Sequence, residues 1–101
     1  MDITKQLVQG TCHLTCNGAF TFNDHPEFRA ILDGFADASV QHVVMHLAGV
    51  EFVDSAALGM LLLALDESEK QKKPLTLQGA VGQVKKMFDM ANFHTLFKIE
   101  P

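Results

Sequence analysis

The fold is decided by residues 43–65, which read VVMHLAGVEFVDSAALGMLLLAL. The stretch begins with an apolar, β-branched run that is too short for a helix and typical of a strand buried on both faces. Gly49 interrupts this run, and Val50 to Val53 lead to the polar pair Asp54-Ser55. The alanine, leucine and methionine residues that follow have high helix propensity. The stretch therefore predicts a strand, a turn and a helix, with Asp54-Ser55 at the helix N-terminus.

The predicted helix entrance combines a hydroxyl group with an apolar surface. Asp and Ser are favoured there because their side-chain oxygens accept hydrogen bonds from unpaired backbone N–H groups. The segment from Ala56 to Leu65 is apolar on every side for about three turns, and polarity returns at Asp66. A small domain does not usually cover one helix on all of its faces. We therefore expect part of the helix start, including Met60, to stay exposed near Ser55.

The composition is that of one globular domain spanning residues 1–101. Of the 101 residues, 48% are hydrophobic and 20% are charged, which suits a single core and excludes a disordered chain. A net charge of −4 without an extended basic cluster argues against nucleic-acid binding. The longest apolar run is about half of the roughly 20 residues that cross a bilayer, so no membrane insertion is expected. The N-terminus has no apolar signal segment, which predicts a cytoplasmic protein.

The first part of the chain predicts a β-hairpin. A weak strand pattern runs from Ile3 to Gln9, and residues Thr11 to Cys16 then alternate cleanly between apolar and polar. Asn17-Gly18 is a turn signal, so the second strand is expected to end there. Cys12 and Cys16 fall on one face and His13 on the other, and a second ligand pair is missing. This pattern favours buried, reduced thiols over a metal site.

Three helices and three further strands are predicted from apolar periods and end signals. Asn23 or Asp24 caps the first helix, which has Pro26 in its first turn. The strands span residues 40–47, 75–78 and 95–99, and the second helix spans residues 55–70. The core-facing positions of the first and third helices are Phe28, Ile31, Leu32, Phe35, Val84, Met87, Phe88 and Ala91. The order β-β-α-β-α-β-α-β predicts an α/β fold with a mixed, mainly parallel central β-sheet flanked by helices.

No catalytic constellation is apparent, so we expect the protein not to be an enzyme. Ser55 lacks the glycine that a nucleophile elbow places two residues before its serine, because Val53 occupies that position. The motifs of phosphate, dinucleotide and zinc-helix sites are absent, and neither a cofactor nor a metal is predicted. The acidic residues before Asp54 are scattered, which argues against a phospho-aspartate receiver. His42 and His46 are about 13 Å apart on the predicted strand, too far to share a metal.

Residues 50–59, VEFVDSAALG, resemble the signature of STAS domains, in particular that of bacterial anti-sigma factor antagonists. In that family the segment reads apolar-Asp-Ser, then Ser, Thr or Ala, then Gly or Ala, and finally Leu-Gly. The order of elements fits as well, so the resemblance extends over nearly the whole chain. It implies a single STAS domain with an antiparallel first strand at the edge of the sheet.

The resemblance also implies a phosphorylation switch at Ser55. In anti-sigma factor antagonists the matching serine is phosphorylated by an anti-sigma factor that is itself an ATP-dependent serine kinase, and a PP2C-type phosphatase reverses the modification. The unphosphorylated antagonist binds the kinase and frees the sigma factor. A phosphate on Ser55 would add a charge of about −1.5 to −2, which is compatible with a helix N-terminus but not with a partner docked there. The expected partner-binding residues are Asp54, Ser55, Ala56, Leu58, Gly59 and Met60.

Two departures from the family pattern and one alternative accompany this interpretation. Ala56 replaces the second hydroxyl of the motif, which leaves Ser55 as the only acceptor. Upstream, Gly18-Ala19-Phe20-Thr21 stands where many members have Gly-Glu-Leu-Asp, whose acidic residues lie near the switch serine, and this allows a different partner. The alternative is a STAS subunit of a larger assembly, such as a stressosome or a lipid-transport complex. There the helix is a permanent interface and Ser55 only a helix cap.

Overall fold

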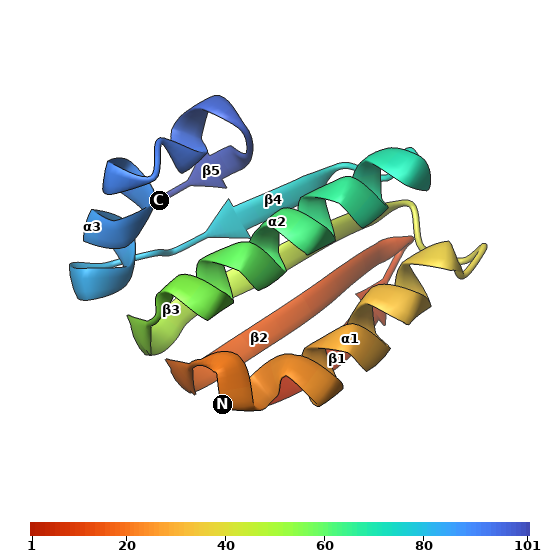
Figure 1. Ribbon diagram of the computed structural model, residues 1–101. Helices are drawn as coiled ribbons and strands as arrows, with labels where there is room; N and C mark the ends of the chain where they lie inside the picture. Colours follow the sequence, from red (N-terminus) through yellow and green to blue (C-terminus); the bar gives the residue numbers. More distant parts are fainter.

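A five-stranded sheet in the order β1-β2-β3-β4-β5 forms the centre of the computed structural model, which describes residues 1–101 (Figure 1). β1 pairs antiparallel with β2, and the other neighbouring strands are parallel. The predicted α/β fold, its order of elements and its antiparallel edge strand are confirmed. The strands are β1 (Asp2–Val8), β2 (Thr11–Phe20), β3 (His42–Val53), β4 (Leu75–Gln78) and β5 (Lys98–Glu100). The helices are α1 (His25–Asp33), α2 (Ser55–Lys70) and α3 (Gly82–Met90), with short 3-10 helices η1 (Phe22–Asp24), η2 (Gly34–Ala36) and η3 (Phe93–Thr95).

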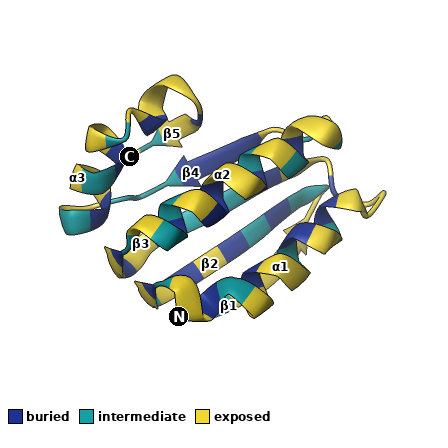
Figure 2. Cartoon of the chain, in the orientation of Figure 1, coloured by how far each residue is buried: buried dark blue, intermediate teal, exposed yellow.

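One face of the sheet is covered by helices. α1 and α2 lie across this face (Figure 1), as expected when successive parallel strands are joined by right-handed crossovers. Buried and more exposed residues alternate along the inner strands (Figure 2). The residues of β2 and β3 that face the helices are buried, among them Leu14 and Met45. The side chains of the opposite face are mostly polar and mostly half-buried or exposed, among them His13, Thr15 and His46. The sheet is therefore an interior layer on one side and a surface on the other.

The core lies between the sheet and the helices and is rich in phenylalanine. Phe20 and Phe28 have ring centroids 5.2 Å apart, which joins the end of β2 to α1. Phe93 lies 5.1 Å from Phe88 and 4.9 Å from Phe97 by the same measure, which joins α3 to the segment before β5. Most of the predicted core-facing positions are buried, and the others pack against the core at its margin: Ile31, Met87 and Ala91. None of the helices has both the length and the apolar character that crossing a membrane requires.

The strand β2 is longer than the sequence predicted. Asn17-Gly18 does not form a turn, because β2 continues to Phe20. Its pairing with β3 shifts register between Thr15 and Asn17 and again between Gly18 and Ala19. Gly18 has a φ of +99°, a conformation that side chains disfavour, and the strand uses it to accommodate the irregularity. The turn signal therefore marks a bulge, and the prediction of a turn was wrong.

The strand β3 also passes the point where it was predicted to end. It runs through Gly49 to Val53. Gly49 is accommodated within the strand because its missing side chain leaves room for the side chain of Asn17 on β2, with which a Cβ atom would collide. β4 pairs only with residues 43–46 of β3, so the second half of β3 projects beyond its neighbour. This projection carries Asp54-Ser55 to the end of the sheet.

The C-terminal segment differs from its prediction as well. Residues 95–99 were expected to form the last strand, but β5 begins at Lys98 and is preceded by η3. Phe93 and Phe97 both enter the core, and the turn of η3 between them brings their side chains to the same side. Of the apolar residues in the predicted strand, Phe97 is therefore a core anchor that follows a short helical turn, and only Ile99 lies in β5.

Candidate functional site

The side chain of Asp54 organises the N-terminus of α2. Asp54 is the N-cap residue, and its Oδ1 atom accepts a hydrogen bond of 2.8 Å from the backbone N–H of Ala57. Its Oδ2 atom accepts a second bond of 3.2 Å from the backbone N–H of Phe22 in η1. One carboxylate therefore fixes both the first turn of α2 and the loop that follows β2. Such a capping aspartate contributes about 0.5–2 kcal/mol to stability.

Ser55 is the first residue of α2 and does not cap it. Its side chain is exposed, and its hydroxyl makes no hydrogen bond within the protein. The other serines of the chain are engaged: the Ser39 hydroxyl donates to Asp37 over 2.7 Å, and the buried Ser68 hydroxyl donates to the Leu65 carbonyl over 2.8 Å. The interpretation of Ser55 as a helix cap is therefore wrong, because Asp54 fills that role. Ser55 remains as a free hydroxyl at a helix N-terminus.

Exposed apolar residues lie on three elements that meet near the start of α2. Phe22 in η1 is 66% exposed, and Phe52 near the end of β3 is 45% exposed. On α2, Gly59 and Leu62 follow Ser55 at spacings of four and seven residues and share its exposed stripe. We call Ser55 and these four residues, Phe22, Phe52, Gly59 and Leu62, the Ser55 surface. Single exposed apolar residues are ordinary in a soluble protein, so it is their occurrence on several elements near the N-terminus of α2 that makes this surface a candidate interaction site.

The expectation that Met60 is exposed was wrong. Met60 is 3% exposed and belongs to the core, because five residues along a helix place it about 140° around the axis from Ser55. Leu62 and Leu63 are the exposed apolar residues of α2 instead. Of the other residues predicted to bind a partner, Ala56 and Leu58 are half-buried, and Gly59 is exposed. Counting four and seven residues on from Ser55, the spacings of one helix face, would have placed Leu62 on the exposed side and Met60 off it.

The end of β3 is held by α3. The side-chain amide of Gln83 accepts a hydrogen bond of 3.0 Å from the Val53 N–H and donates one of 3.0 Å to the Val53 carbonyl. On the other side, the Asp54 N–H donates to the Phe20 carbonyl of β2 over 3.3 Å. Gln83 therefore replaces the strand neighbour that β4 does not supply. Nothing in the sequence identified this role, because the pairing depends on how far β3 projects.

The segment that departs from the family pattern lies beside this site. Residues 18–20 form the end of β2 and pair with residues 50–53 of β3. Thr21 forms a capping box with Asp24, whose Oδ2 atom accepts from the Thr21 N–H over 2.8 Å. Asp24 also forms an ion pair of 3.0 Å with the amino group of Met1. The loop next to Ser55 is thus well anchored, and Ala19 brings no negative charge to it.

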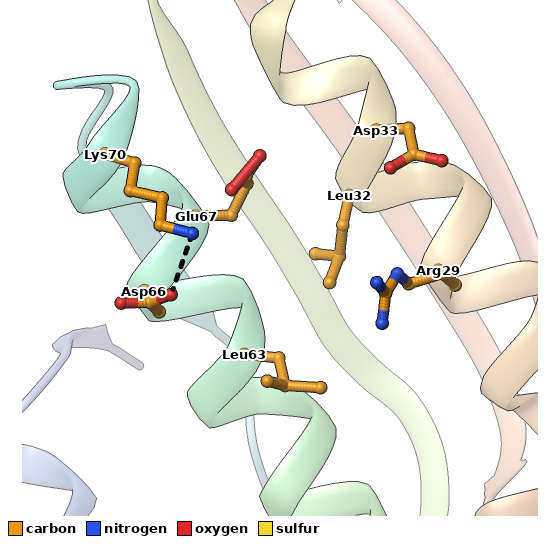
Figure 3. Close-up of a pocket in the computed structure, with 7 residues that line it drawn as sticks. All are labelled: Arg29, Leu32, Asp33, Leu63, Asp66, Glu67 and Lys70. Carbon is orange, nitrogen blue, oxygen red and sulfur yellow. Dashed lines mark ion pairs between the residues drawn. The ribbon is translucent and has the colours of Figure 1, made fainter.

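The surface has two hollows, and neither holds a recognisable combination of catalytic side chains. A shallow groove of about 150 Å³ lies between α1 and α2, and Figure 3 shows Leu32 and Arg29 facing Leu63 across it. Its rim carries both acidic and basic side chains and includes an Asp66–Lys70 ion pair of 3.6 Å. A second hollow of about 240 Å³ lies between α3 and the C-terminal residues. No three His, Cys, Asp or Glu side chains converge in a way that would hold a metal ion.

A family model for the STAS domain matches residues 2–101. This chain belongs to the STAS-domain family. A STAS-domain-containing protein of Pseudomonas aeruginosa (strain UCBPP-PA14) is 35% identical over 82 residues, which cover 81% of this chain and 80% of that protein. The family predicted from residues 50–59 is therefore confirmed.

Solved structures of anti-sigma factor antagonists have the same fold. One from Mycobacterium paratuberculosis has a TM-score of 0.86 and 15% identity, covering 99% of this chain and 85% of that one. Unphosphorylated SpoIIAA has a TM-score of 0.76 and 16% identity, covering 99% of this chain and 87% of that one. Phosphorylated SpoIIAA, from Bacillus, has a TM-score of 0.75 and 15% identity, covering 97% of this chain and 90% of that one. At these identities the likeness shows the fold alone.

Proposed function

We propose that this STAS domain is an anti-sigma factor antagonist controlled by phosphorylation of Ser55. With Ser55 unmodified, it binds an anti-sigma factor that is also a serine kinase, and the sigma factor is released. Phosphorylation by that kinase ends the complex, and a PP2C-type phosphatase restores the binding form. In this role the protein is a cytoplasmic regulator of transcription and performs no catalysis itself.

The free, exposed hydroxyl of Ser55 is the observation that carries this proposal. A kinase needs an acceptor that it can reach, and Ser39 and Ser68 are both occupied by hydrogen bonds. Phosphorylation at the first residue of α2 places the new charge at the positive end of the helix dipole. The Asp54 cap is a separate group, so the modification breaks no bond that holds the helix. The domain is expected to keep its fold in both states.

The structural neighbours are consistent with a switch that leaves the fold intact. The two SpoIIAA structures, one unphosphorylated and one phosphorylated, resemble this chain almost equally, with TM-scores of 0.76 and 0.75. In that case phosphorylation changes the binding of the partner and not the fold of the domain. A partner packed on Phe22, Phe52 and Leu62 would have to remove water from a phosphate beside the Asp54 carboxylate, and that desolvation is unfavourable.

A binding experiment with matched variants tests the proposal. Wild-type, Ser55→Ala and Ser55→Asp proteins are immobilised, and partners are captured from a native lysate with and without ATP. We expect Ser55→Ala to retain a serine kinase in both conditions, wild type to lose it with ATP, and Ser55→Asp to bind weakly throughout. Phosphopeptide mapping should place the phosphate on Ser55, with Ser39→Ala as the control that leaves phosphorylation unchanged.

The same experiment separates the switch from a permanent interface. If this domain were a fixed subunit of a larger assembly, all three proteins would capture the same partners whether or not ATP was present. Ser55 would then also be unmodified in protein isolated from cells. That result would reject the phosphorylation switch and leave the STAS fold assignment untouched.

A further inference from the structure

Two histidines meet on the uncovered face of the sheet. The Nδ1 atom of His13 on β2 lies 2.8 Å from the Nε2 atom of His46 on β3, and the two rings stack with centroids 5.1 Å apart. The strand register explains the contact. Thr15 is the direct neighbour of His46 and Val44 that of His13, so the two histidines are diagonal neighbours on one face. The residues are 33 positions apart in sequence, and neither strand pattern alone pairs them.

The surroundings leave the pair available to an ion. Both side chains are half-buried, and neither ring forms another hydrogen bond within the protein. The strand register places Gln6 of β1 beside His13 and Gln78 of β4 beside His46. The charged residues of this face lie farther off, at its margins: Asp2 beside Asn17, and Lys98 and Glu100 on β5. No cation faces the pair directly, and no carboxylate competes for its nitrogens.

We propose that His13 and His46 bind a divalent transition-metal ion of the Zn²⁺ class through Nδ1 and Nε2. Imidazole nitrogen suits Zn²⁺, Ni²⁺ and Cu²⁺, and water completes the coordination shell because no third side-chain ligand converges here. Zn–N bonds of about 2.0–2.1 Å at a tetrahedral angle separate the two nitrogens by about 3.3 Å. The pair therefore has to open by about half an ångström, which small side-chain rotations on a solvent-facing surface supply.

The proton that the pair now shares must move for the metal to bind. In the neutral pair, one of the two facing nitrogens carries a hydrogen and donates it to the lone pair of the other. Metal binding needs both lone pairs, so the donor ring shifts to its other tautomer, and water carries the proton to its outer nitrogen. No net proton is released from the neutral pair.

The test is a calorimetric titration of the folded protein with Zn²⁺ at neutral pH. We expect one ion per chain, and we expect His13→Gln and His46→Gln each to weaken binding by at least tenfold. Loss of an outer-shell partner alone costs about 10–100-fold in affinity, so loss of a ligand should cost no less. His42→Gln is the matched control, because His42 is an exposed histidine on the same strand as His46 and on the same face. It should leave the titration unchanged.

A second measurement uses the unmodified protein and does not depend on the variants folding. Nitrogen NMR of the imidazole rings should show Zn²⁺ shifting the resonances of His13 and His46, with His25, His42 and His94 unaffected. The proposal is overturned if the shifts appear first at another histidine, or if His42→Gln weakens binding as much as His13→Gln does. A titration without a saturable event at one equivalent of Zn²⁺ would overturn it equally.

Discussion

The Asp54 carboxylate accepts a 2.8 Å hydrogen bond from the backbone N–H of Ala57, so the cap of α2 is Asp54 and the hydroxyl of the next residue, Ser55, is left free. The residue that stabilises the helix and the residue that offers a hydroxyl are neighbours with different tasks. A group added to Ser55 therefore leaves the bonds of Asp54 in place. A charge added to Ser55 is therefore expected to change how a partner packs on the Ser55 surface without changing the fold.

The first prediction compares the stabilities of two alanine variants. Asp54→Ala should lower the free energy of unfolding by about 0.5–2 kcal/mol, because the cap of α2 is lost together with the bond to Phe22. Ser55→Ala removes no hydrogen bond and should stay within about 0.5 kcal/mol of wild type. Urea unfolding followed by circular dichroism measures both. An equal loss in the two variants would show that the Ser55 hydroxyl carries part of the cap.

The second prediction distinguishes the surface of α2 from its buried side. Leu62→Glu introduces a charge into the Ser55 surface and should weaken binding of the captured kinase, while the melting temperature stays near that of wild type. Met60→Ala should instead lower the free energy of unfolding by about 2–5 kcal/mol, because Met60 is buried in the core. Its folded fraction should bind the kinase with ordinary affinity. Thermal unfolding and a binding titration of each variant provide the comparison, and the reverse pattern would place Met60 in the interface.

The third prediction concerns the two free thiols. Burial raises the pKa of Cys16 to about 12 and also raises the pKa of Cys12. Thiolate is the reactive form, so neither cysteine should react with a thiol reagent at pH 8 until the protein unfolds. Reaction with Ellman's reagent, followed across a urea series, should track the unfolding transition. Rapid labelling of the native protein would contradict the burial of both side chains.

The same shift predicts a dependence of stability on alkaline pH. The folded state holds the Cys16 proton more tightly than the unfolded state, whose thiol has the ordinary pKa of about 9.0. The resulting stabilisation is complete below pH 9 and is lost as the pH rises from 9 toward 12. Cys16→Ala should therefore show a weaker alkaline loss of stability than wild type, measured by urea unfolding at several pH values.

Local patterns were sufficient to predict the elements of this fold but not all of their ends. The second helix was predicted over residues 55–70, and α2 has those bounds, because the apolar run and the lysines after it mark both ends. Asn17-Gly18 and Gly49 were interpreted as breaks. In the structure they face each other across β2 and β3, where the missing side chain of Gly49 makes room for Asn17. A glycine that ends a strand and one that admits a neighbour look alike in sequence.

The candidate site was predictable to the extent that it depends on neighbours in sequence. Asp54-Ser55 at a helix start follows from a local pattern, and the structure places both residues there. The cap itself is a local bond between Asp54 and Ala57, three residues apart, whereas the contributions of Phe22 and Gln83 depend on contacts between distant segments. The His13–His46 pair depends on the register between two parallel strands. A single sequence does not specify that register, because several offsets keep the same faces buried.

The last prediction concerns Gln83 of α3, whose side chain forms hydrogen bonds with the last residue of β3. Gln83→Ala leaves the N–H and carbonyl groups of Val53 without protein partners and should lower the free energy of unfolding by about 1–3 kcal/mol. The position is half-buried, so water can replace part of the interaction and the lower end of that range applies. Lys86→Ala, an exposed change on the same helix, should be nearly neutral.

A carboxylate at the same position gives the prediction a pH signature. Gln83→Glu keeps an oxygen that accepts from the Val53 N–H but, when ionised, it cannot donate to the Val53 carbonyl. As the pH falls through the ordinary glutamate pKa of about 4.3, the carboxyl gains a proton that it can donate, so the deficit relative to wild type should shrink. Urea unfolding of both proteins at neutral pH and near pH 4 measures this difference, with amide hydrogen exchange at Val53 as the local readout. A deficit that is the same at both pH values would show that Gln83 acts through packing and not through its paired hydrogen bonds.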